Sequence, residues 1–179
     1  GMRGVAYEAT LYDYRVVNDA KVWVGLNGDN GLANVFNQHV TDSIRVSNNS
    51  WGTSSGTSIT SVSEATLRSD YSQAITAAKA AIDNGTLFVF AAGNDSKGEV
   101  DLFGGIPHRI SELSDSWLVV VAVDPDNKET AYTNRCGVAA AFCVTAPGGG
   151  DNSLTTGIYA ADNDGGYIRY KGTSMAAPH

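Results

Sequence analysis

Two uninterrupted apolar runs, residues 87–92 and 117–123, constrain the fold more than any other feature of this chain. Both are short, rich in Val and Phe, and bounded by turn residues. Each therefore predicts a strand that is buried on both faces, as in the middle of a parallel sheet. Neither run approaches the ~20 apolar residues that a membrane-spanning helix needs. We expect no signal peptide, no anchor and no membrane contact by this segment.

The segments around these runs alternate between helical and strand patterns. Apolar residues recur at helical spacing in residues 32–40 and in the longer stretch 64–84, which ends at Asn84-Gly85. Residues 44–48 predict a further strand, residues 11–17 an earlier one, and residues 138–146 a last strand or hairpin. This alternation predicts an open α/β sheet.

Composition and charge limit the partners. The chain has 179 residues, of which 42% are hydrophobic and 17% charged, and it shows neither a repeat nor a linker. It is therefore one globular domain or a large piece of one. Its 12 Lys and Arg stand against 19 Asp and Glu, a net charge of -7. Because such a surface repels phosphate backbones, we expect no nucleic-acid partner.

Polar residues gather where the predicted strands end. Residues 48–52 and 93–95 follow two of these strands, and ligands of open α/β sheets bind beyond the carboxyl ends of the strands. At the end of the chain, Ser174 stands between Gly172 and a Met-Ala-Ala run. Pro178 is tolerated only in the first turn of a helix, so Ser174 lies near a helix start, where N–H groups stabilise an oxyanion. Ser174 is a candidate nucleophile, and the alternative is an ordinary N-cap serine.

Residues 172–179, GTSMAAPH, resemble the nucleophile signature of the subtilisin-like serine proteases, the subtilases. Residues 91–95, AAGND, are similar to the oxyanion-hole segment of that family, and residues 48–52, NNSWG, to the strand that lines its primary specificity pocket. Residues 4–17 resemble the stretch that follows the helix carrying the catalytic histidine. The resemblance covers the whole chain, with the landmarks in the order of the family.

The resemblance implies a three-layer, mainly parallel sheet with helices on both faces, truncated at both ends. It also implies a serine endopeptidase acting on a polypeptide substrate through an acyl-enzyme. Ser174 would be the nucleophile, and Asn94 would donate its side-chain amide to the oxyanion beside the Ser174 N–H. The substrate-binding residues that it implies are Ser50, Trp51, Gly52, Ala92 and Gly93.

The chain departs from the family in one respect. Subtilases carry their catalytic triad in the order Asp, His, Ser. His39 and His108 lack the His-Gly-Thr setting of the family, and His179 lies ~7.5 Å along the helix and ~140° around it from Ser174. We therefore interpret residues 1–179 as part of a subtilase catalytic domain, from after the catalytic His through the start of the nucleophile helix.

Under this interpretation, we expect the fragment to be inactive alone. Its main partner is then the remainder of its own catalytic domain. A catalytically silent module that binds peptides is the first alternative. An α/β domain in which the serine only caps a helix is the second. Gly1-Met2 fits either a cloning remnant or the family pattern.

Cys136 and Cys143 leave two interpretations open by themselves: buried thiols in a reducing compartment, or a disulfide in an oxidising one. They look like the paired cysteines of autotransporter subtilases from Gram-negative bacteria. That resemblance favours the disulfide and a secreted or cell-surface location. Residues 27–31 and 162–165 resemble calcium loops but lack the spacing to a bidentate glutamate. We expect no metal and no cofactor.

Overall fold

The computed structural model describes residues 6–14, 16, 29–150 and 155–179. Its centre is a four-stranded sheet in which all neighbours are parallel and the strands stand in chain order. The strands are β1 (Val46–Asn49), β2 (Leu87–Ala91), β3 (Trp117–Val123) and β4 (Cys143–Pro147). Both apolar runs form the two central strands, as predicted. Their register places Phe88 beside Trp117 and Val119 beside Cys143.

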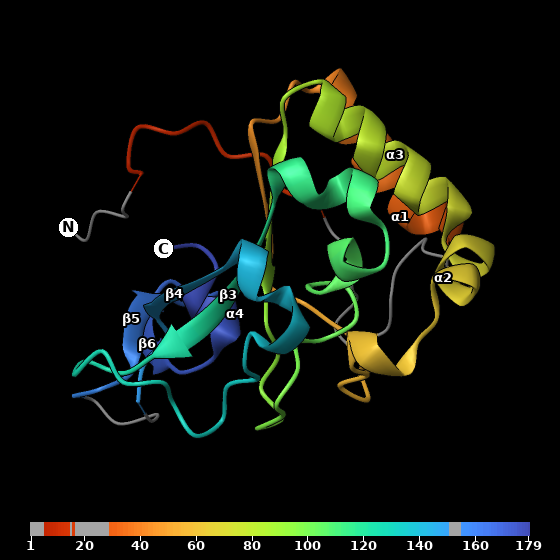
Figure 1. Cartoon of the computed structure of the whole chain (residues 1–179). Coiled ribbons are helices and arrows are strands. Elements are labelled where there is room, and N and C mark those ends of the chain that lie inside the picture. The colour runs from red at the N-terminus through yellow and green to blue at the C-terminus, as the bar shows by residue number, and fades with distance from the viewer. Residues whose placement is uncertain (1–5, 15, 17–28, 151–154) are drawn as a thin grey trace.

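Helices α1 (Asp29–Thr41) and α3 (Ser72–Asp83) lie side by side across one face of this sheet, and α2 (Glu64–Asp70) lies next to the start of α3 (Figure 1). The larger hydrophobic core fills the space between them and the sheet. Trp117 stacks on Phe88 and Phe90, with ring centroids 4.9 and 4.7 Å apart. Stacked rings of this kind bury much apolar area between helix and sheet.

The opposite face is covered by α4 (Thr173–Ala176). Ala176 and Ala177 pack there against Val89 and Val120 of the two central strands. Small side chains let the helix approach the sheet closely. The sheet therefore has helices on both faces, and the predicted three-layer α/β class is confirmed.

An antiparallel hairpin, β5 (Ile158–Ala161) and β6 (Tyr167–Tyr170), leads into α4. Residues 162–165 form its turn, where Asp162 and Asp164 each accept a hydrogen bond from a backbone N–H nearby. These carboxylates therefore have a local structural use.

The helix predicted over residues 64–84 is divided at Tyr71, whose backbone leaves the helical region with φ -132° and ψ 28°. The carboxylate of Asp29 accepts hydrogen bonds from the N–H groups of Gln73 and Ala74, at 2.9 and 2.6 Å. A residue of α1 thus caps the start of α3. Because this cap comes from a distant part of the chain, the local periodicity gave no sign of the break.

Two strand predictions were wrong in whole or in part. Residues 138–142 belong to a 3₁₀ helix, η4 (Gly137–Phe142), and the strand begins only at Cys143. Residues 11–14 and 16 form no strand, and Leu11 is 90% exposed. Residues 15 and 17 of that prediction, and residues 27 and 28 of the stretch that resembles a calcium loop, lie outside the described residues. In the part of the chain that the structure describes, no helix has the length and apolarity to cross a membrane.

Candidate active site

Ser174 is the second residue of α4 and is half-buried. The helix begins after Gly172, whose φ of 150° and ψ of 161° suit glycine, and whose N–H donates to the carbonyl of Gly148 at 2.9 Å. A Cβ at residue 172 would also lie 3.6 Å from both polar atoms of the Asn94 carboxamide. The positive φ therefore accounts for glycine at the turn into α4, whereas an added Cβ would only come into ordinary contact with Asn94.

Asn94 follows β2 and reaches the first turn of α4. Its Oδ1 accepts hydrogen bonds from the backbone N–H and the hydroxyl of Thr173, at 2.8 and 3.1 Å. The Thr173 hydroxyl in turn accepts the N–H of Gly93 at 3.2 Å. These contacts use the carboxamide oxygen as an acceptor. The Nδ2 N–H groups of Asn94 therefore remain as donors beside the helix start.

Ser50, just beyond β1, contacts Ser174 twice. The Ser174 hydroxyl donates to the carbonyl of Ser50 at 3.1 Å, and the Ser50 hydroxyl donates to the carbonyl of Ser174 at 2.8 Å. The ends of β1 and β2 thus meet the start of α4, as expected for ligand-binding loops at the carboxyl edge of a parallel sheet. The structure brings together Ser50, Asn94 and Ser174.

The side chain of Trp51 packs against core aromatic residues. Its half-buried ring packs edge-on against Phe90 at 5.2 Å and Phe103 at 5.1 Å. This ring therefore contributes to the core beneath the segment.

Gly93 depends on a residue that the sequence did not single out. Its φ is 105°, and a Cβ there would lie 2.3 Å from Nδ2 of Asn134. Asn134 is fully buried; its amide donates to the carbonyl of Ala92 at 3.1 Å, and its Oδ1 accepts the N–H groups of Asp95 and Lys97. One buried carboxamide thus fixes the turn that carries Asn94.

Asp101 was also missed by the sequence reasoning. Its side chain is 2% exposed and accepts hydrogen bonds from the N–H and the hydroxyl of Thr53 and from the N–H of Phe103. Burial raises the pKa of this carboxyl above its ordinary value, while these hydrogen bonds act in the opposite direction. No sequence signal marks it beyond an acidic residue among apolar ones.

Two of the three histidines form hydrogen bonds with groups other than the Ser174 hydroxyl, and the third is exposed. In His39, Nδ1 donates to the carbonyl of Val35 at 2.6 Å, so Nε2 accepts the hydroxyl of Ser47 at 2.9 Å. His179 contacts the carbonyl of Met175 at 2.8 Å, and His108 lies exposed after a 3₁₀ turn. None of the three is hydrogen-bonded to the Ser174 hydroxyl.

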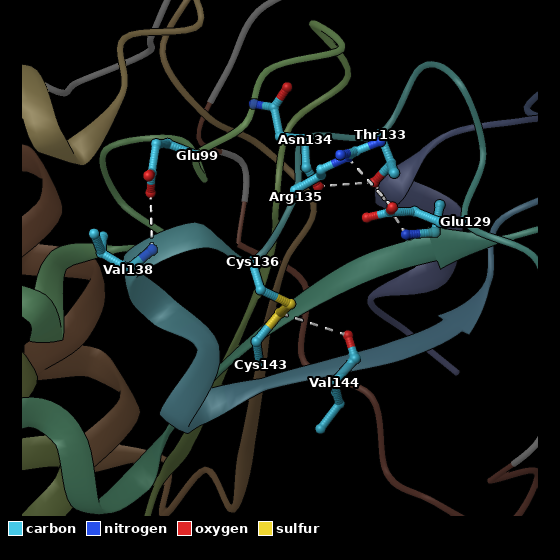
Figure 2. The surroundings of a disulfide bond; sticks show 10 residues. Glu99, Glu129, Thr133, Asn134, Arg135, Cys136, Val138, Cys143 and Val144 are labelled. Atoms are coloured by element: carbon cyan, nitrogen blue, oxygen red, sulfur yellow. Dashed lines mark hydrogen bonds and ion pairs between the residues drawn. A yellow bond between two sulfur atoms is a disulfide. The ribbon is translucent and has the colours of Figure 1, made fainter.

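Figure 2 shows the disulfide between Cys136 and Cys143, with an S–S distance of 2.01 Å. It joins the start of η4 to the start of β4. Glu99 accepts the N–H of Val138 at 2.8 Å and holds the other side of this short helix. Among the residues that the structure describes, no group of three His, Cys, Asp or Glu side chains could hold a metal ion.

The structure thus places the Ser174 hydroxyl and the Asn94 carboxamide at the carboxyl edge of a parallel α/β sheet. The sequence model of the Subtilase family matches residues 1–179, so the chain belongs to this family.

Several known proteins are similar to the chain. Serotype-specific antigen 1 of Mannheimia haemolytica is 38% identical over 110 residues, covering 59% of this chain and 11% of the antigen. Alkaline elastase YaB of Bacillus sp. (strain YaB) is 29% identical over 179 residues, covering the whole chain and 38% of the elastase. An extracellular serine protease of Serratia marcescens is 29% identical over 113 residues, covering 54% of the chain and 11% of the protease. The chain thus spans only 11% to 38% of the length of these relatives.

Solved structures agree on the fold. Sphericase has a TM-score of 0.69 at 22% identity and covers 100% of this chain and 54% of its own. The patellamide maturation protease PatA has a TM-score of 0.64 at 23% identity, with 90% of this chain and 48% of its own covered. At these identities the likeness establishes the subtilisin-like fold.

Proposed function

We propose that this chain is the central and nucleophile-bearing part of a secreted serine endopeptidase. The observation that carries the proposal is the meeting of Ser174, Asn94 and Ser50 at one edge of the sheet. Asn94 Oδ1 accepts two hydrogen bonds from Thr173. The Nδ2 N–H groups are therefore available to donate to an oxyanion beside Ser174. Such donors act most strongly when they are fixed before charge develops.

In the proposed reaction, Ser174 Oγ bonds to the carbonyl carbon of a peptide bond while its proton passes to a histidine. The tetrahedral oxyanion then accepts hydrogen bonds from Asn94 Nδ2 and the Ser174 N–H. The C–N bond breaks, the amine leaves with the proton, and water hydrolyses the acyl-enzyme. We expect residues 1–179 alone to be inactive and to need the remainder of the catalytic domain, because none of their three histidines is hydrogen-bonded to the Ser174 hydroxyl.

The proposed substrate is an extended polypeptide that lies along the backbone of residues 50–52. Main-chain hydrogen bonding of this kind adds a strand to an exposed edge. A Cβ at Gly52 would collide with Asp101 and one at Gly93 with Asn134, so both glycines are needed for the packing around the site. Ala92 is fully buried in the larger core.

Two observations support secretion, which we propose to be from a Gram-negative bacterium. The disulfide of Cys136 and Cys143 suits an oxidising compartment. Among the relatives, one is named an extracellular serine protease and another a serotype-specific antigen. We expect the protein at the cell surface or in the medium.

The test is active-site labelling of the full-length protein with a fluorophosphonate, which phosphonylates an activated serine. We expect labelling of the unmodified protein and of the control Ser114→Ala, an exposed serine in the 3₁₀ helix at residues 111–116. Ser174→Ala should abolish it. Labelling that survives in Ser174→Ala would refute this nucleophile. A full-length protein that binds peptides but neither labels nor cleaves would favour the silent peptide-binding module instead.

A further inference from the structure

We propose that the hydroxyl of Tyr132 positions the turn that carries Ser174 relative to the loop that carries Asn94. Tyr132 is then a positioning residue, which acts on the reaction without touching the substrate. The inference rests on the proposed endopeptidase function and adds a residue to it. It comes from the hydrogen bonds that link this one tyrosine to both segments.

The backbone of Tyr132 holds the loop of Asn94. Its carbonyl accepts the N–H of Ser96 at 3.0 Å, two residues beyond Asn94. The neighbouring Asn134 binds the same loop through its buried side chain, and its backbone N–H donates to the carbonyl of Gly93 at 2.9 Å. This stretch of the chain therefore fixes one side of the site.

The side chain of Tyr132 holds the turn of Ser174. Its hydroxyl donates to the carbonyls of Gly148 and Gly149, at 2.8 and 2.6 Å, with one proton shared between the two acceptors. The same Gly148 carbonyl accepts the N–H of Gly172 at 2.9 Å, two residues before Ser174. A backbone carbonyl has two lone pairs, so it can accept from both donors at once. The phenol therefore fixes the acceptor to which Gly172 is bound.

This second attachment matters because one point of contact leaves rotation free. The contact of Asn94 with Thr173 fixes the distance between the two segments at one point. Gly172 has φ 150° and ψ 161°, outside the helical region, so the direction in which α4 leaves this turn depends on how Gly172 is held. Its hydrogen bond to Gly148 supplies the second point. Because reacting atoms must be closely aligned, a shift of about 1 Å at Ser174 can cost ~10²-fold in rate.

The ring of Tyr132 is held independently of its hydroxyl. It is half-buried against the hydrophobic cluster between α4 and the sheet, and the ammonium nitrogen of Lys171 lies 5.4 Å from the ring centroid. Burial raises the pKa of the hydroxyl above its ordinary value, while contacts with Thr130 and Gly172 act in the opposite direction. The hydroxyl therefore keeps its proton at neutral pH and remains a donor. Replacement by phenylalanine keeps the ring contacts and removes only this donor.

The experiment compares kcat and KM for one peptide substrate in the full-length protein, Tyr132→Phe and Tyr159→Phe. We expect Tyr132→Phe to lower kcat by ~10- to 100-fold and to leave KM within about threefold, because the turn is displaced while the peptide still binds. Tyr159→Phe, which removes a hydroxyl from an exposed tyrosine of β5, should change neither. A Tyr132→Phe variant that is less stable to urea but cleaves at the normal rate has lost only a structural contact and would overturn the inference.

A double-mutant cycle tests whether Tyr132 acts through the oxyanion donor. Tyr132→Phe is combined with Asn94→Ala, which removes that donor. If Tyr132 aligns Ser174 with Asn94, its replacement should lower kcat by less than about threefold in the Asn94→Ala background, because no alignment is left to lose. The same loss in both backgrounds would contradict the proposed role.

A rescue variant keeps the inference testable if Tyr132→Phe does not fold. Para-aminophenylalanine in place of Tyr132 retains the ring and offers an N–H donor instead of the O–H, so kcat should stay within about threefold of the unmodified protein. A folded amino variant that is ~10-fold slower or more would refute the role of the donor. Fluorophosphonate labelling separates this result from the proposed function. A protein whose Ser174 labels but whose Tyr132→Phe variant cleaves normally keeps its proposed function and loses only this inference.

Discussion

The side-chain oxygen of Asn94 lies 2.8 Å from the backbone nitrogen of Thr173, so a residue beyond β2 satisfies the first turn of α4. The two residues are 79 positions apart in the chain. Their contact sets the orientation of the carboxamide, because an amide whose oxygen accepts must present its nitrogen elsewhere. Four predictions follow from this arrangement and from the residues around it.

Asn94→Ala should lower kcat by ~10²–10³ with little change in KM, a magnitude borrowed from a subtilisin rather than derived from this geometry. Asn94→Asp keeps an oxygen acceptor for Thr173 but has no N–H donor. It should therefore be at least as slow. Steady-state kinetics on the full-length protein measure both, and recovery of turnover in Asn94→Asp would show that Asn94 acts only as a cap.

Thr173→Val should destabilise the domain by ~1–3 kcal/mol and also slow turnover. The hydroxyl is fully buried, accepts the N–H of Gly93 and donates to Asn94 Oδ1, so its removal leaves buried polar groups without partners. Urea unfolding gives the stability and peptide cleavage gives the rate. Thr173→Ser retains the hydroxyl and should restore turnover. Equal turnover in the Val and Ser variants would contradict this role.

Replacing Cys136 and Cys143 together by serine should lower the free energy of unfolding by ~2–3 kcal/mol. The bridge spans a sequence separation of 7, and a short closed loop restricts the unfolded chain by about this much. Urea unfolding with and without reductant measures it. The reductant should affect the unmodified protein and leave the double variant unchanged, and the opposite pattern would argue against the bridge.

Acid should destabilise the domain through His39. Burial lowers the pKa of this imidazole below its ordinary 6.5, while its bond to Val35 and the charge of Asp42 act in the opposite direction. Between the two pKa values the unfolded chain binds more protons than the folded one. The contribution of His39 is thus complete above about pH 6.5 and is lost as the pH falls toward the lowered folded pKa.

The measurement is urea unfolding of the unmodified protein, His39→Gln and His108→Gln at pH 7.5 and at pH 5. The difference in stability between the two pH values should shrink in His39→Gln. It should persist in His108→Gln, where the replaced side chain is exposed. The same loss in all three proteins would assign the acid sensitivity to other groups.

The sequence predicted those parts of the fold that depend on local pattern. Continuous apolar runs identified β2 and β3, because a strand buried on both faces needs no polar side chain. The division at Tyr71 depends on Asp29, which caps α3 from another helix. Interactions between distant segments leave no trace in local periodicity.

The candidate site was predicted mainly through resemblance. Three segments resemble those of the subtilases, and they identified Ser174, Asn94 and Ser50. The structure brings these three residues together. Asn134 and Asp101 were not found, because a buried polar residue within a turn-rich stretch looks like any solvated loop residue until its partners are known.

The paired hydrogen bonds of Ser50 and Ser174 join residues 124 positions apart. A ribosome therefore releases the first half of the site long before the second. Both hydrogen bonds can form only after Ser174 has been synthesised, so this edge of the sheet stays incomplete until then.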